Sequence, residues 1–183
     1  MDKPWYRKLF GRPAESAMES TEVNVDHEDA EVQFGLGLKF ANDKSAAQDY
    51  AQAAHWYHKA ADQSHALAQF NLGVMYARGQ GVDRNDVTAT MWLGKAAQQG
   101  DAGAQYHLGM RQHRASIGGQ PSDAVESRIE AFKWLHLAAA QGYKGSVAAC
   151  EFVTLGMTLQ EVTDGRHRTA AFVAVNLNHP EAQ

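Results

Sequence analysis

Ala68-Gln69-Phe70-Asn71-Leu72-Gly73-Val74-Met75-Tyr76 lies near the middle of the chain and recurs, with changes, on both sides of it. A related segment, 32–40 (VQFGLGLKF), begins 36 residues upstream, and another, 104–109 (AQYHLG), begins 36 residues downstream. A fixed spacing of this length is typical of repeat proteins, in which each unit is a hairpin that buries its apolar face by stacking on its neighbours. Function is therefore expected on an extended surface rather than in one pocket.

A second recurring segment confirms the register of these units. It occurs at residues 56–61 (WYHKAA), 92–97 (WLGKAA) and 134–139 (WLHLAA). The first two copies are 36 residues apart and the last two are 42 apart. The third unit therefore contains six additional residues.

The additional residues must lie between positions 110 and 129. A glycine pair and Pro121 in this interval predict irregular chain, and Ser122 or Asp123 is a candidate cap for the next helix. We expect an enlarged loop at residues 114–123. In solenoids such loops often serve in binding, although a tolerated insertion without a role is an equal alternative.

Residues 66–86 (ALAQFNLGVMYARGQGVDRND) and 89–100 (ATMWLGKAAQQG) resemble the Sel1-like repeat, a relative of the tetratricopeptide repeat. The resemblance extends from about Asp29 to about Val173, with a fourth, atypical unit at the end. The first unit lacks the Gly-x-Gly-Val turn, and Gln112 replaces an expected aromatic residue. The resemblance implies an all-α fold: a right-handed α/α solenoid of three to four helix-hairpin repeats with an atypical C-terminal capping helix. It also implies binding of other macromolecules and no reaction.

One glycine recurs inside the first helix of each unit, at Gly37, Gly73 and Gly109. Glycine within a helix costs roughly 1 kcal/mol relative to alanine, so its repetition predicts that another helix crosses closely there. Near the end of the chain, residues 158–161 (TLQE) form the pattern of a capping box that opens a last helix.

The sequence divides into three segments: residues 1–27 are a basic-aromatic head and acidic linker, 28–175 the solenoid, and 176–183 a tail. Residues 1–14 carry a net charge of +3, from four cations and one Asp, whereas the whole chain carries −4. The head has apolar residues at helical spacing and is predicted to dock on a partner, on a membrane surface or on the solenoid itself. These docking residues are Trp5, Tyr6, Leu9 and Phe10.

The sequence contains none of the common catalytic or metal-binding motifs, so we expect no enzymatic activity, no cofactor and no metal site. His55, His58 and His136 lack a regularly spaced further ligand and are expected to be exposed. Cys150 is the only cysteine, which excludes an internal disulfide, and its apolar neighbours predict a buried side chain. The negative net charge argues against nucleic acid, and the absence of a secretory signal or apolar span predicts a cytoplasmic protein, with membrane contact only through the head.

The leading functional hypothesis is an adaptor or regulatory module that binds a protein or peptide in the concave groove of the solenoid. By analogy with tetratricopeptide units, the first helices line this groove. The candidate groove residues are Phe34, Leu38, Phe70, Val74, Arg78, Tyr106, Met110 and Arg114. Aromatic and Arg anchors dominate many interfaces, but the alternative is that packing between adjacent repeats explains all three aromatic residues.

Two alternative functions come from other classes. One is a toxin-neutralising or effector-associated protein in bacterial antagonism. The other is a β-lactam-hydrolysing enzyme, which the resemblance makes less favourable because that branch of the family depends on paired cysteines within each repeat.

Overall fold

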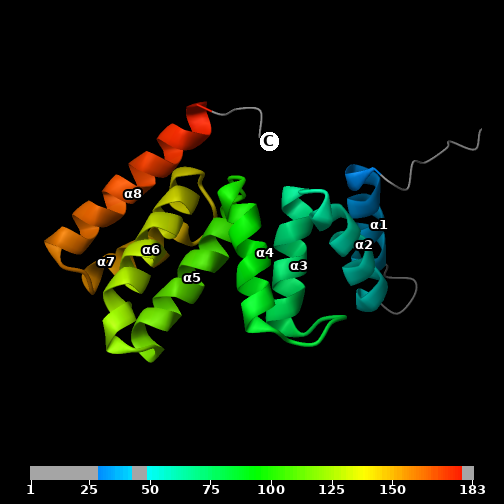
Figure 1. The fold of residues 1–183 in the computed structure, drawn as a ribbon, viewed down its shortest axis with the longest axis horizontal. Helices are drawn as coiled ribbons and strands as arrows, with labels where there is room; N and C mark the ends of the chain where they lie inside the picture. Colours follow the sequence, from blue (N-terminus) through cyan, green and yellow to red (C-terminus); the bar gives the residue numbers. More distant parts are fainter. Residues whose placement is uncertain (1–28, 43–48, 179–183) are drawn as a thin grey trace, which may run out of the picture.

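The computed structural model describes residues 29–42 and 49–178. Within these residues the chain is entirely helical, and the helices follow one another along the long axis of the molecule (Figure 1). Their bounds are α1 Ala30–Asn42, α2 Tyr50–Asp62, α3 Ala66–Arg78, α4 Asp86–Gln98, α5 Ala102–Gly118, α6 Pro121–Ala140, α7 Ser146–Leu155 and α8 Leu159–Asn178. The predicted helical-repeat architecture is confirmed. The head and linker lie outside the described residues, and α8 ends within the segment that the sequence assigns to the tail.

Side chains at the start of six helices accept a hydrogen bond from the backbone N–H three residues later, which satisfies one of the free donors there. The acceptors are Asp29, Asp49, His65, Asn85 and Asp101, which begin α1 to α5 in order, and Thr158, which begins α8. Polar capping residues therefore mark where both helices of a hairpin start.

The recurring glycines lie where the two helices of a hairpin cross, as predicted. An added Cβ atom would approach a large side chain of the second helix too closely at each of them. The distances would be 2.5 Å from Gly37 to Tyr57, 2.8 Å from Gly73 to Leu93 and 2.7 Å from Gly109 to Leu135. Small residues also recur in the second helices, where Ala60, Ala96 and Ala138 are fully buried.

Buried glutamines connect successive hairpins, a feature that the sequence analysis did not identify. Gln33, Gln69 and Gln105 are at most 5% exposed and follow the 36-residue spacing. Each accepts a hydrogen bond from a glutamine at the end of the second helix of its unit, at 2.8 to 3.0 Å: Gln63, Gln99 and Gln141 respectively. Gln69 and Gln105 also donate to backbone carbonyl oxygens of the preceding hairpin, those of Ala61 and Ala97. A repeated position thus holds a buried amide that is hydrogen-bonded within the protein.

The prediction of an enlarged loop at residues 114–123 in the third hairpin is wrong. The additional residues lengthen the helices instead: α5 has 17 residues and α6 has 20, against 13 in each helix of the second hairpin. The connection is only Gly119 and Gln120, and neither Ser122 nor Asp123 caps α6. Pro121 occupies the first turn, where its fixed φ and missing N–H favour a helix start.

The last two helices form the atypical end that was predicted. Both α7 and α8 pack against α6. The capping box is present, because Thr158 N–H donates to the Glu161 carboxylate at 2.7 Å and Glu161 N–H donates to the Thr158 hydroxyl at 3.3 Å. Arg128 of α6 pairs with Glu161 at 2.6 Å, and Arg168 of α8 pairs with two carboxylates of α6.

Across the described ranges, 29–42 and 49–178, no helix combines the length and apolar character that crossing a bilayer requires.

Candidate functional site

Two adjoining cavities run along the first helices of the first three hairpins. The larger, of about 370 Å³, lies between α1, α2 and α3. The smaller, of about 160 Å³, lies between α3, α4 and α5. Val74 and Arg78 of α3 line both cavities, so the two form one surface, which we call the first-helix groove.

The first-helix groove contains five of the eight predicted groove residues. Leu38 lies in the larger cavity, Met110 and Arg114 lie in the smaller, and Val74 and Arg78 belong to both. They come from α1, α3 and α5 at equivalent positions of successive units. The structure therefore brings together residues that are 36 positions apart in the sequence.

The three predicted aromatic residues lie outside both cavities. Phe34 is only 8% exposed and stacks on His65, with ring centroids 4.5 Å apart. Phe70 is half-buried beside His107, and Tyr106 is half-buried beside Tyr143. His107 belongs to the hairpin that follows Phe70. His65 and Tyr143 lie in the short segments just before α3 and α7, which follow the first and third hairpins. This placement matches the alternative interpretation, packing between repeats.

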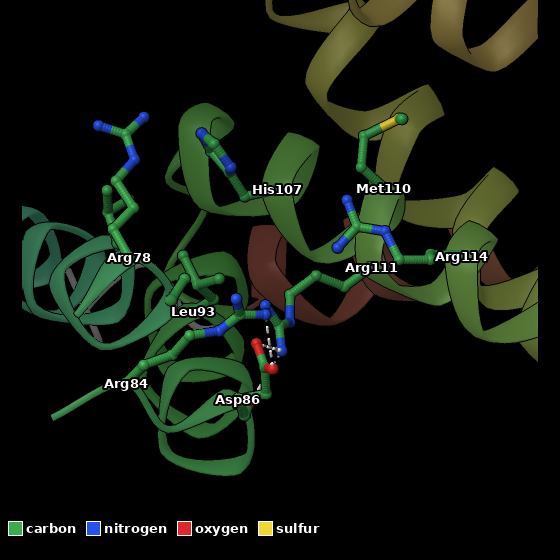
Figure 2. Close-up of a pocket in the computed structure, with 10 residues that line it drawn as sticks. Arg78, Arg84, Asp86, Leu93, His107, Met110, Arg111 and Arg114 are labelled. Carbon is green, nitrogen blue, oxygen red and sulfur yellow. Dashed lines mark hydrogen bonds and ion pairs between the residues drawn. The ribbon is translucent and has the colours of Figure 1, made fainter. Parts of the chain in front are cut away.

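The smaller cavity carries an ion-pair cluster that sequence analysis missed. Asp86, at the start of α4, accepts hydrogen bonds from Arg111 at 2.9 Å and from Arg84 at 3.1 Å. Arg111 also donates to the Thr90 hydroxyl and to the Asp86 carbonyl oxygen. These arginines, Arg111 first, hold the pKa of Asp86 below its usual value. Figure 2 shows Arg84 and Arg111 converging on Asp86.

His107 of α5 lines the same cavity and was also missed. Burial lowers the pKa of its imidazole, and the nearby positive charge of Arg78 lowers that pKa further. A histidine with a lowered pKa is neutral at pH 7, so it offers one hydrogen-bond donor and one acceptor. The cavity charge at that pH therefore depends on Asp86 and the arginines.

The signal for these residues was weak in the sequence. Arg84 lies in the turn between α3 and α4, and Asp86 is the first residue of α4. Arg111 lies 25 residues after Asp86. Only the stacking of α5 on α4 brings them together. The arginine density at residues 78–84 and 111–114 was the one available clue.

Other side chains with potential chemistry lie apart from the groove. Cys150 is half-buried, less enclosed than predicted, and burial raises the pKa of its thiol. His55, His58 and His136 are exposed, as predicted. Within residues 29–42 and 49–178, no three His, Cys, Asp or Glu side chains are grouped so that they could hold a metal ion. The predicted docking residues of the head, Trp5, Tyr6, Leu9 and Phe10, lie outside the described residues.

The model of the Sel1 repeat family matches residues 30–65, 66–101 and 102–143, which are the first three hairpins. A search of curated proteins found no match.

Two solved structures are similar in fold. A protective antigen present in uropathogenic Escherichia coli strains, which displays an SLR fold, has a TM-score of 0.69 and 24% identity over 81% of this chain and 31% of its own. A Sel1 repeat protein from Oxalobacter formigenes has a TM-score of 0.59 and 32% identity over 67% of this chain and 48% of its own. This chain thus spans less than half of either relative.

Proposed function

The chain belongs to the Sel1 repeat family, and we propose that it is a protein- or peptide-binding adaptor whose binding surface is the first-helix groove. Proteins of this family generally serve protein–protein interaction and are generally not enzymes. One observation carries the proposal. Equivalent positions of three successive first helices line two cavities that share Val74 and Arg78.

The composition of the larger cavity suits an extended polypeptide. Leu38 is 37% exposed and offers an apolar contact. Asn71 of α3 is half-buried, and its side-chain amide can both donate to and accept from a peptide backbone. An extended segment laid along α1, α3 and α5 would contact apolar, amide and charged side chains in turn.

A double substitution in the larger cavity tests this function. The full chain with Leu38→Ala and Asn71→Ala should retain captured partners at least about tenfold less well than the natural chain, because a few central residues dominate most interfaces. Partners are captured from a lysate of the source cell and identified by mass spectrometry, and their affinities are then measured with purified protein. Neither side chain is fully buried, so the melting temperature should change little.

The matched control changes two exposed apolar residues away from the groove. Val147 of α7 is 57% exposed and Leu159 of α8 is 85% exposed, and both become alanine. Retention by this control should equal that of the natural chain. Equal retention by the groove variant, or an equal loss in the control, would move the binding surface elsewhere.

A further inference from the structure

The smaller cavity concentrates positive charge in a chain that is negative as a whole. Four arginines line it, Arg78, Arg84, Arg111 and Arg114, and Asp86 is its one carboxylate. With His107 neutral, four cations and one anion give the cavity +3, whereas the entire chain carries −4. Like charges held together cost free energy unless an opposite charge accompanies them. The cavity is therefore suited to an anion.

The four arginines of the smaller cavity are of two kinds: two are anchored by Asp86, and two make no ion pair with a described residue. Asp86 engages Arg84 and Arg111, and Arg111 is held by further hydrogen bonds to α4. Arg78 and Arg114 are exposed, and neither makes an ion pair with any described residue. In the view of Figure 2 they stand on either side of the Asp86 cluster. Two guanidinium groups are thus available to a ligand beside a neighbouring Arg111 that is already fixed in place.

The size and surroundings of the cavity select the kind of anion. About 160 Å³ accommodates one carboxylate-sized group with part of its stem. The adjoining cavity has no charged residue in its lining except Arg78 and contains Leu38, Tyr57 and Asn71. A nucleic acid would need a continuous basic stripe for its phosphates. A polypeptide with an acidic side chain beside apolar residues fits both cavities.

We infer that the smaller cavity binds an acidic side chain of a partner polypeptide, whose neighbouring residues lie in the larger cavity. This inference rests on the proposed function, to which it adds the chemistry of the partner. Arg78 and Arg114 contact the carboxylate, because an arginine can give a carboxylate two parallel hydrogen bonds. Arg84 and Asp86 position Arg111, which supplies further positive charge.

Fluorescence anisotropy with the full chain tests the inference. The probes are labelled seven-residue peptides of alternating Val and Glu, a matching peptide with Gln in place of Glu, and one with phosphoserine in place of Glu. The Glu peptide should bind at least about tenfold more tightly than the Gln peptide, because hydrogen bonds from arginine to a carboxylate are stronger than those to a neutral amide, and a tenfold change corresponds to about 1.4 kcal/mol. Added salt should reduce this difference.

Variants then locate the effect. Arg78→Gln with Arg114→Gln should remove the preference for Glu over Gln and leave the melting temperature nearly unchanged, because both side chains are exposed. Lys144→Gln with Arg166→Gln removes the same charge from exposed positions outside the groove and should keep the preference. A preference that survives the first pair, or is lost equally in the second, overturns the assignment.

Other outcomes separate this inference from the proposed function. Equal binding of the Glu and Gln peptides, lost on Leu38→Ala with Asn71→Ala, would retain the groove and overturn the acidic ligand. Tighter binding of the phosphoserine peptide, or competition by free inorganic phosphate at the concentration of the Glu peptide, would replace the carboxylate by a phosphate. No binding of the Glu peptide to the full chain, with binding restored by Glu15→Gln, Glu19→Gln and Glu22→Gln, would assign the cavity to the chain's own acidic linker. No binding in either protein overturns the inference outright.

Discussion

The middle of the array and its C-terminal end are stabilised by different kinds of contact. From α2 to α5, the contacts between hairpins use buried alanines and uncharged glutamines, of which Gln69 and Gln105 are almost fully buried. At the C-terminal end, ion pairs join α8 to α6, where Arg128 meets Glu161 and Arg168 meets Glu130. The middle relies on close packing and neutral hydrogen bonds, with the Arg111–Asp86 ion pair in the smaller cavity, whereas the C-terminal end adds several ion pairs to its packing.

Solvent exposure explains the difference. A helix in the middle has a neighbour on each side, so a polar group there must find a partner inside the protein, and neutral amides meet this need at a lower desolvation cost than charges. The last helix has one face in water, where the Arg168 side chain is 35% exposed and its partner Glu126 is 61% exposed, whereas the buried Glu161 receives hydrogen bonds from Thr158 and Arg128. The repeat pattern is consequently strict in the middle and relaxed at the end.

Gly73→Leu should have the largest effect on stability. An added Cβ would lie 2.8 Å from Leu93 Cγ and 3.1 Å from the Leu93 backbone nitrogen, so both the core and the path of α4 would have to shift. We expect a loss of about 3 kcal/mol in the free energy of unfolding, at the upper end for overpacking, measured by urea denaturation.

Gly94→Leu is the matched control for that change. Gly94 lies in α4, where an added Cβ meets no atom within 4 Å. Removal of a helical glycine should leave stability unchanged or raise it by up to about 1 kcal/mol. If Gly73→Leu and Gly94→Leu unfold alike, close packing does not distinguish the middle of the array.

Gln105→Leu should have a smaller effect, of about 1–2 kcal/mol. The leucine keeps the volume but leaves the Ala97 carbonyl oxygen without the hydrogen bond that it now receives at 3.2 Å, and Gln141 loses an acceptor. Urea denaturation measures the loss. The exposed Gln98 provides the control, since Gln98→Leu should stay within about 0.5 kcal/mol of the natural chain. A neutral Gln105→Leu would show that packing alone holds the middle together.

The sequence predicted those features that depend on the repeat period or on neighbouring residues. Gly73 was assigned to a helix crossing because it recurs every 36 residues, and Thr158 with Glu161 was assigned to a capping box because that motif is local. Both assignments are confirmed. Each needed only the residue type and its spacing.

Features that depend on which neighbour faces a side chain could not be predicted in the same way. Phe70 follows the same period as Val74, yet Phe70 packs against the next hairpin and Val74 lines the groove. Periodicity identifies equivalent residues but not the direction in which they point. The pairing of Arg111 with Asp86 and the lengthening of α5 in place of a loop likewise depend on how α5 and α6 stack.

Glu161→Gln should have the smallest effect and should depend on pH. Burial alone would raise the pKa of the Glu161 carboxyl, but hydrogen bonds from Thr158 and Arg128 outweigh burial and lower it. A carboxyl with a lowered folded-state pKa stabilises the fold fully above its unfolded-state pKa, near 4.5, and loses this contribution as the pH falls through the folded-state value.

Glutamine can still complete a capping box, so Glu161→Gln isolates the charge on the ion pair with Arg128. We expect a loss of about 1 kcal/mol at pH 7 and a smaller loss at an acid pH below the lowered folded-state pKa, where the natural carboxyl is itself protonated. Hydrogen exchange of α8 at the two pH values measures both quantities, and exposed Glu151→Gln in α7 should change neither. A loss that is equal at both pH values would mean that shape rather than charge holds α8 on α6. The middle of the array and its C-terminal end would then differ only in how their side chains pack.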